Sequence, residues 1–250
     1  VAVCIYHLLT LSISPLPWLD EVMFCSVSHA LAKTGHYVCE VMPSRIGGEE
    51  VLFYGPNFFL LTSWIERLFG FGMIQFRAVS FVSGFILLHL SLKLYKTYFN
   101  NAHQSAFILL FLLILIDPGI VSSMHGGRMD LMAACWMLGA FFFFLKARGK
   151  ASLGERVKNL SLMALLASMG VLTTPRSGFL LITISIFMFM DLFNKDKRER
   201  FLELLICLFV FAVPLLVWFF YSLYKSQYEP EIELENNETN NNYEPIKNAA

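Results

Sequence analysis

Charged residues are scarce in this sequence, at 15% of its 250 residues, whereas soluble domains typically hold about 25%. Basic and acidic residues number 19 each, which makes the formal net charge zero. The small charged fraction excludes intrinsic disorder along the whole chain. The balance of charge excludes both a basic nucleic-acid binder and an acidic solvating protein, so no nucleic-acid partner is expected.

Several chemical motifs are also absent. The sequence has no glycine-rich phosphate loop, no HExxH pattern and no Cys-x-x-Cys pair. Its histidines and cysteines form no cluster with metal-ligand spacing, and no repeat of solenoid length is present. These absences argue against a nucleotide-binding loop and a repeat array, and the sequence predicts no metal centre.

Apolar residues, in contrast, are abundant. They make up 56% of the chain, which contains 25 phenylalanines and has a mean hydropathy of +0.59. A helix that crosses a bilayer needs roughly 17–25 mostly apolar residues. Runs of this kind are found at 1–14, 77–96, 105–122, 131–146, 159–174, 178–193 and 202–224. The sequence therefore predicts an all-α polytopic membrane protein with about seven transmembrane helices in residues 1–224, followed by a polar, disordered tail at 225–250.

Two further segments predict helices that lie on the membrane surface instead of crossing it. Both fall in the long loop 15–76, at residues 20–34 and 57–69, and each carries an apolar stripe with helical spacing. The first stripe holds Met23, Val27, Ala30 and Leu31; the second holds Phe58, Leu61, Ile65, Leu68 and Phe69, opposite Ser63, Glu66 and Arg67.

Charge sorts the loops between the two membrane faces. With the 15–76 loop outside, the segments 93–104, 146–158 and 191–203 lie inside and hold 11 basic and five acidic residues. This excess follows the positive-inside rule, and a crossing at 57–69 would reverse it. We expect an integral protein of a bacterial inner or plasma membrane, or of the endoplasmic reticulum, with a periplasmic, extracellular or luminal active face.

Polar side chains gather at this outer face, next to apolar runs, where an unpaired charge is costly. Asp20 and Glu21 directly follow the first predicted span. They suit a general base or a metal ligand at the membrane surface. The alternative is that Asp20 caps the helix that follows, and a cap would also keep its carboxylate ionised.

The loop between the third and fourth spans is the second candidate. It reads MHGGRMD over residues 124–130, and its two glycines permit a tight turn. Arg128 offers a planar set of donors that suits phosphate or carboxylate. The alternatives are a structural pair between Arg128 and Asp130, and an ordinary loop histidine at His125.

Two more outer residues are candidates. Arg176, between the fifth and sixth spans, departs from the positive-inside trend, which indicates an anionic partner. Snorkelling to lipid headgroups is an equal alternative. Tyr54 precedes the second surface helix, where it either presents its hydroxyl to the site or has a structural role with the Gly-Pro-Asn that follows.

Taken in order, these motifs resemble a known family. Asp-Glu after the first span, then YGPNFFLLTSWIERLFGFGMIQFRAVS, GGRMDLM and TTPRSGFLL, are similar to the polyprenyl-phosphate-dependent membrane glycosyltransferases of the GT-C fold, glycosyltransferase family 39. The chain resembles dolichyl-phosphate-mannose protein mannosyltransferases and the bacterial aminoarabinose transferase. The resemblance covers roughly residues 1–195 and implies the N-terminal membrane half of such an enzyme.

The resemblance implies a specific chemistry. A sugar passes from a polyprenyl-phosphate donor to a hydroxyl of a protein, lipid or glycan by inverting displacement. Asp20, with Glu21, matches the family's acidic residue and acts as base. Arg128 and Arg176 match its phosphate-binding cations, supported by Asp130, His125 and Tyr54. No cofactor is certain, and a divalent cation at Asp20 and Glu21 is left open.

Two other functions compete with this one. An inactive or truncated GT-C-derived protein would bind a polyprenyl-phosphate lipid or act as a scaffold subunit. A transporter would need charged or broken helices near mid-membrane, and only His89 and Pro214 fit that description. The transporter is therefore ranked last.

Overall fold

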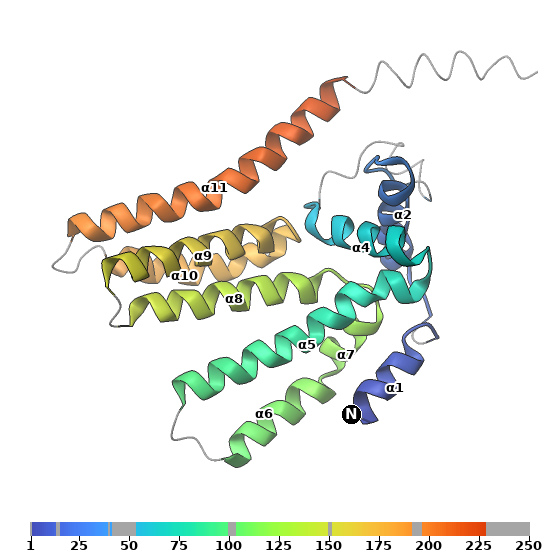
Figure 1. The fold of residues 1–250 in the computed structure, drawn as a ribbon, viewed down its shortest axis with the longest axis horizontal. Helices are drawn as coiled ribbons and strands as arrows, with labels where there is room; N and C mark the ends of the chain where they lie inside the picture. Colours follow the sequence, from blue (N-terminus) through green and yellow to red (C-terminus); the bar gives the residue numbers. More distant parts are fainter. Residues whose placement is uncertain are drawn as a thin grey trace, which may run out of the picture.

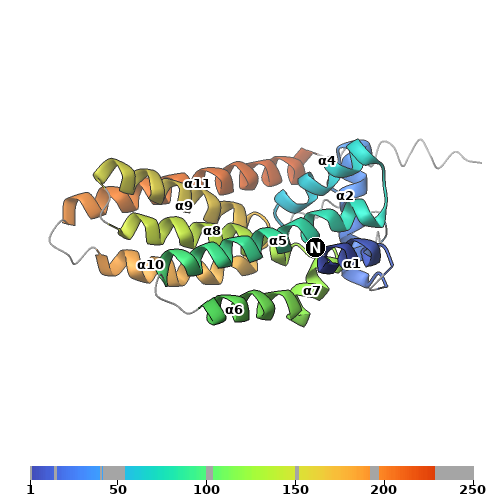
Figure 2. The same ribbon diagram turned by 60° about the horizontal axis from the view of Figure 1, so that its bottom comes forward.

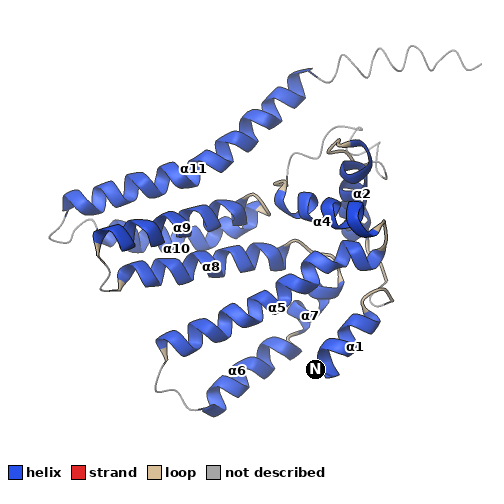
Figure 3. Cartoon of the chain, in the orientation of Figure 1, coloured by secondary structure: helices blue, strands red, loops and turns tan. Residues whose placement is uncertain are grey.

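The computed structural model describes residues 2–13, 16–39, 41, 54–99, 104–149, 152–191 and 197–228. Helices form most of these ranges, and no strand is drawn in them (Figures 1 and 3), so the all-α prediction is confirmed there. In chain order the elements are α1 (Ala2–Thr10), α2 (Leu19–Thr34), α4 (Asn57–Phe69), α5 (Met73–Tyr98), α6 (Gln104–Ile116), α7 (Pro118–His125), α8 (Asp130–Arg148), α9 (Leu153–Val171), the 3-10 turn η1 (Pro175–Gly178), α10 (Phe179–Asp191) and α11 (Lys197–Tyr228).

The longer helices form a bundle with a two-helix cap at one end. α8 packs between α5 and α9, and α9 also packs against α11 (Figures 1 and 2). α2 and α4 pack against each other beside the first turns of α5. α11 runs to Tyr228, slightly into the segment predicted as the polar tail, and residues 229–250 of that tail lie outside the described residues.

Seven complete spans are not confirmed. Three described helices are long and apolar enough to cross a membrane, namely α5, α8 and most of α11, and the pair α6–α7 makes a fourth if it counts as one span. α1 has nine residues, roughly 14 Å of helix against about 30 Å of hydrocarbon. α10 has 13 residues. α9 begins earlier than predicted, and its first turns carry charges at Glu155, Arg156 and Lys158.

The third predicted span, 105–122, is broken. α6 ends at Ile116 and α7 begins at Pro118, with a bend of 48° between them. Proline lacks the N–H of a helical hydrogen bond and clashes with the preceding turn. The Asp117 carboxylate caps α7 by accepting from the Ile120 amide at 2.8 Å. Asp-Pro is thus the start of a new helix inside one apolar run.

The two surface helices are confirmed as helices, and neither is among the described helices that could span a membrane. α4 begins and ends where predicted, and it turns a face of mixed polarity, which includes Phe58 and Phe59, towards the protein. Ser63 and Glu66 are buried, whereas Trp64 and Leu68 are 64% and 76% exposed. An outward apolar face suits a helix that lies against lipid hydrocarbon.

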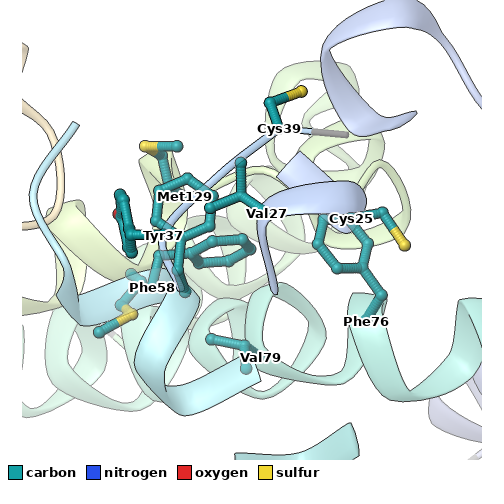
Figure 4. Close-up of a cluster of buried hydrophobic side chains, with 10 residues drawn as sticks. Cys25, Val27, Tyr37, Cys39, Phe58, Phe76, Val79 and Met129 are labelled. Carbon is teal, nitrogen blue, oxygen red and sulfur yellow. The ribbon is translucent and has the colours of Figure 1, made fainter. Parts of the chain in front are cut away.

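An aromatic core holds this cap to the bundle (Figure 4). Phe59 meets Phe24 and Tyr37 edge-on, with ring centroids 5.9 and 5.2 Å apart. Phe58 meets Phe76 of α5 in the same way, at 5.9 Å. Such edge-to-face pairs are favourable beyond the area they bury. The core therefore fixes α2 and α4 against the start of α5.

A carboxylate is buried in the interface between α2 and α4. Glu66 is 4% exposed, and its Oε2 atom lies 3.4 Å from Nδ1 of His29. Neither carboxylate oxygen has a hydrogen-bond partner among the described residues. Burial raises the pKa of Glu66 above its ordinary value, although the neighbouring His29 opposes the rise. Ionisation of Glu66 is therefore less favourable in the fold than in the unfolded chain.

We expect Glu66→Gln to stabilise the protein more as the pH rises. Below the ordinary glutamate pKa both folded and unfolded wild-type chains are protonated, so the two proteins should differ little. Above it the unfolded chain loses its proton first, and the wild-type fold loses stability until the raised pKa is passed. Thermal unfolding in detergent at about pH 4 and about pH 8 should show a gain of a few degrees only at the higher pH.

Glu155→Gln is the control for this experiment, because Glu155 is exposed. Its unfolding midpoint should differ from that of the wild type by the same small amount at both pH values. A pH-independent effect of Glu66→Gln would contradict the assignment of a raised pKa.

Candidate functional site

A buried ion pair holds the end of the bundle where α2 and α5 meet. Arg77 on α5 donates through Nε to Oε1 of Glu21 at 2.5 Å, and through Nη2 to Oε2 at 2.9 Å. Both side chains are fully buried. Two parallel hydrogen bonds between a guanidinium and a carboxylate make a strong and geometrically specific pair. The pair fixes the first turn of α2 to the second turn of α5.

The same arginine ties two other segments to this point. Arg77 donates through Nη1 to the carbonyl oxygen of Leu11, just past α1, at 2.7 Å. A Cβ atom added to Gly127 would lie 2.3 Å from Cε1 of Phe76 and 3.2 Å from Oε1 of Glu21. Gly127 also has φ +57°, which glycine adopts without strain. Glycine therefore lets the turn before α8 approach the ion pair closely.

Asp20 lies beside the ion pair and outside it. It is half-buried in the first turn of α2 and has no hydrogen bond or ion pair with the described residues. The N-cap residue of α2 is Trp18, so the expectation that Asp20 is the cap is wrong. The helix N-terminus still favours its negative charge. Glu21, predicted as its catalytic partner, is inaccessible, so Asp20 is the accessible carboxylate of the two.

Arg128, which pairs with Asp130, lies beside Trp18, the N-cap residue of α2. Arg128 donates through Nε to Oδ2 of Asp130 at 2.9 Å, and their side chains are 37% and 40% exposed. The guanidinium lies over the Trp18 ring, 5.0 Å from its centroid, within reach of a cation–π attraction. Ser80 on α5 donates to the Arg128 carbonyl oxygen at 2.8 Å. Arg128 is thereby fixed next to Trp18, two positions before Asp20.

The two predicted supporting residues His125 and Tyr54 make contacts between elements. His125 is buried, and its Nε2 atom lies 2.7 Å from Nδ1 of His7 on α1. Tyr54 packs edge-on against Phe24 of α2, with ring centroids 5.3 Å apart. His125 thus joins α7 to α1, and Tyr54 joins the segment before α4 to α2.

Arg176 stands apart from the other candidates. It is exposed in η1, and its side chain forms no hydrogen bond, ion pair or cation–π contact within the described part of the chain. η1 packs against α8, α9 and α10, at the bundle end where α8 begins. The structure therefore places Arg176 at the same end as Arg128 without bringing the two into contact.

An apolar pocket of about 280 Å³ lies between α5, α6, α7, α8 and the start of α10. Its lining includes Leu87, Ile114, Ile120, Met137 and Leu180, and Ser91 is its one polar side chain. Leu180 lies four residues after Arg176, about one helical turn away. The pocket is therefore close in sequence and space to the arginine of η1.

Asp20 and Glu21 offer few ligand atoms to a divalent cation that would bind between them. Both oxygens of Glu21 accept hydrogen bonds from Arg77. No group of three or more His, Cys, Asp or Glu side chains gathers in the ranges that the structure covers. Calcium and magnesium take six or more oxygen ligands, partly from water. These residues do not fit a cation held by this carboxylate pair.

Arg77 is the residue of this site that sequence reasoning missed. The second span was predicted to begin at residue 77, which makes the arginine the polar edge of an apolar run. α5 begins at Met73, so Arg77 lies one turn inside the helix. A charge inside an apolar helix needs a partner there. This requirement is the signal in the sequence from which a nearby carboxylate could have been inferred.

The architecture matches two solved structures. They are crystal structures of ArnT from Cupriavidus metallidurans, one in the apo state and one bound to undecaprenyl phosphate. The TM-scores are 0.66 and 0.67, the sequence identity is 20% in both cases, and the match covers 92% of this chain. This chain has the ArnT fold.

The ArnT likeness confirms the expected GT-C fold, and with the apolar helices it makes this chain an integral membrane protein. The match covers 41% of the ArnT chain, so this chain spans about two fifths of that length, which is consistent with the expected N-terminal membrane half. No family model and no curated protein sequence matches this chain.

Glu21→Gln is expected to destabilise the protein strongly. It leaves Arg77 buried without a counter-charge, a change that costs about 3–5 kcal/mol in measured cases. The double variant Glu21→Leu/Arg77→Leu removes both charges and should recover most of this loss. Yield and thermal midpoint in detergent measure the effect, with Glu199→Gln as a surface control because Glu199 is 49% exposed. Equal losses in the single and double variants would contradict the role of the pair.

Proposed function

We propose that this chain is a membrane glycosyltransferase module that transfers a sugar from a polyprenyl-phosphate donor to a hydroxyl of a protein, lipid or glycan. The observation that supports it best is the convergence at Trp18: Arg128 lies over the ring, and the accessible Asp20 follows two residues later. The ArnT structure bound to undecaprenyl phosphate adds a ligand of fitting chemistry, a phosphate on an apolar chain. The reaction is assigned to the outer or luminal membrane face.

Asp20 is the general base in this proposal. The acceptor hydroxyl gives its proton to the Asp20 carboxylate while its oxygen attacks the anomeric carbon of the donor sugar. The bond from that carbon to the phosphate oxygen breaks, and its electron pair leaves with polyprenyl phosphate. The configuration at the anomeric carbon inverts. Glu21 acts indirectly, since it holds the first turn of α2 against Arg77.

Arg128 receives the leaving phosphate. Asp130 engages its Nε atom, and Nη1 and Nη2 have no hydrogen-bond partner among the described residues. The free pair of nitrogens suits two phosphate oxygens, and stabilising charge as it develops lowers the reaction barrier. Trp18 holds the plane of the guanidinium from one side. Arg176 supplies a second exposed cation at the same bundle end.

The apolar pocket between α5, α6, α7, α8 and α10 suits the first isoprene units of the donor lipid. Its volume of about 280 Å³ and its apolar lining fit hydrocarbon and exclude a charged sugar phosphate. The position of Leu180 one turn after Arg176 lets a phosphate lie at the arginine while its chain enters the pocket.

Asp20→Asn should lower sugar transfer by about 10²- to 10⁴-fold, the range for loss of a general base. Membranes that contain the wild-type or variant chain are incubated with polyprenyl-phosphate-linked sugars, and released polyprenyl phosphate is quantified by mass spectrometry. Asp117→Asn is the matched control, because Asp117 is an exposed carboxylate with a capping role that asparagine also fills.

Each outcome of this experiment is informative. Unchanged release from Asp20→Asn would exclude Asp20 as the base. Wild-type chain that binds polyprenyl phosphate and releases none from the sugar-linked donor would replace the transferase by a lipid-binding or scaffold protein of the same fold.

Arg128→Gln should weaken binding of polyprenyl phosphate by about 10- to 100-fold, since hydrogen bonds to a charged group contribute roughly 1.5–3 kcal/mol. Equilibrium binding of undecaprenyl phosphate to the purified chain in detergent measures the change. Arg198→Gln removes an exposed arginine at the far end of the bundle and should leave binding unchanged. Equal affinities of Arg128→Gln and Arg198→Gln would remove Arg128 from the phosphate site.

A further inference from the structure

The end of the bundle opposite Asp20 and Arg128 carries a separate feature. α8 has 19 residues and is roughly 28 Å long, and this feature lies at its C-terminal end. There a narrow notch lies between the ends of α8, α9, α10 and α11. Its lining combines apolar side chains with two arginines and one carboxylate, and it includes Phe144, Arg148, Leu160, Arg200, Glu203 and Leu204. The proposed glycosyl transfer uses none of them.

Arg200 stands on one wall of the notch with an unused donor. It donates through Nη1 to Oε2 of Glu203 at 3.0 Å, and its buried Nε atom has no hydrogen-bond partner in the described ranges. Glu203 also accepts from Nε of Arg156 at 2.9 Å, so two arginines share one carboxylate. A buried donor without an acceptor is costly, and an oxygen that entered the notch would relieve that cost.

Arg148 forms the other cationic wall. Its guanidinium lies over the rings of Phe144 and Phe187, 5.7 and 5.4 Å from their centroids. Stacking on aromatic faces holds the plane of an arginine side chain in one orientation. Two oriented guanidinium groups thus border one opening.

The segments that meet at this end are basic. The described ends of α8, α9, α10 and α11 hold seven basic residues (Lys146, Arg148, Arg156, Lys158, Lys197, Arg198 and Arg200) and four acidic ones (Glu155, Asp191, Glu199 and Glu203). An excess of this sign marks the membrane face whose anionic lipids attract lysine and arginine. Past the notch the apolar surface continues along α11, where Leu205 and Leu208 are 46% and 54% exposed. A ligand that joins an anionic group to hydrocarbon matches both parts.

We propose that this notch binds the phosphate of an anionic phospholipid from the leaflet opposite the glycosyl-transfer site. A phosphate oxygen accepts a hydrogen bond from Nε of Arg200, Arg148 borders the same anion, and the acyl chains lie along α11. Only 6% of the apolar window of α11 is buried, so a lipid that bridges α8 and α11 adds contacts that α11 otherwise lacks. This binding does not depend on the proposed glycosyltransferase activity.

The test compares lipids of different charge on the purified full chain. The chain in zwitterionic detergent receives phosphatidylglycerol or phosphatidylcholine, and the thermal unfolding midpoint is recorded. The wild type should gain about 3–6 °C with phosphatidylglycerol and little with phosphatidylcholine. Arg200→Gln should lose most of this gain, and Arg200→Lys should keep part of it because it keeps the charge. The readout is the gain on adding lipid, so a lower starting midpoint does not affect it.

Arg198→Gln is the matched control, because Arg198 is exposed, lies two residues from Arg200 and does not line the notch. It should keep the full gain. The proposal is overturned if Arg198→Gln loses as much as Arg200→Gln, if phosphatidylcholine gives the same gain, or if millimolar inorganic phosphate reproduces it. Should Arg200→Gln fail to fold, Arg148→Gln replaces it, and a full gain from that variant would also overturn the proposal.

Discussion

The buried pair of Arg77 and Glu21 is the interaction on which the candidate site depends. A guanidinium without solvent contact needs partners for its donors, and Arg77 finds them on α2 and at the end of α1. Gly127 then brings the turn before α8 against the same carboxylate. The ion pair therefore links α2, α5 and the end of α1 and lies against the turn before α8, and two of these segments carry Asp20 and Arg128.

The pair also explains why two adjacent carboxylates have different surroundings. Successive residues of an α-helix point about 100° apart, so Asp20 and Glu21 face different directions from the first turn of α2. Glu21 faces Arg77 and is fully buried, while Asp20 is half-buried without a partner in the described chain. In the Asp-Glu motif, Glu21 thus holds the first turn of α2 in place, and Asp20 projects from that same turn.

Features that depend on a local pattern of residues were predicted correctly. Predictions were wrong or incomplete where one pattern is compatible with two different structures. α4 was predicted to the residue because Gly70 ends its helical periodicity. Its apolar stripe is divided in the structure, with Phe58 in the core and Leu68 exposed, because an apolar side chain is stabilised by a protein core and by lipid alike. The break at Asp117-Pro118 was missed because hydropathy averages over a helix start. Arg77 was missed because the predicted apolar run begins at that residue. The contact of Arg128 with Trp18 was missed because the two residues are far apart in the sequence and share no local pattern.

The distribution of charge at the site end bears on the chemistry. Among the described candidates, Arg77 is neutralised by Glu21 and Arg128 by Asp130, whereas Asp20 and Arg176 have no partner. An unpaired carboxylate can accept a proton from a substrate, and an unpaired guanidinium at a membrane surface is stabilised by an anion. The proposed reaction delivers both, because the acceptor hydroxyl gives up a proton and the donor lipid leaves as a phosphate. In the proposed reaction, both unpaired charges would thus gain an opposite partner as the bond to the leaving phosphate breaks, and interactions that strengthen towards the transition state are the ones that raise a rate.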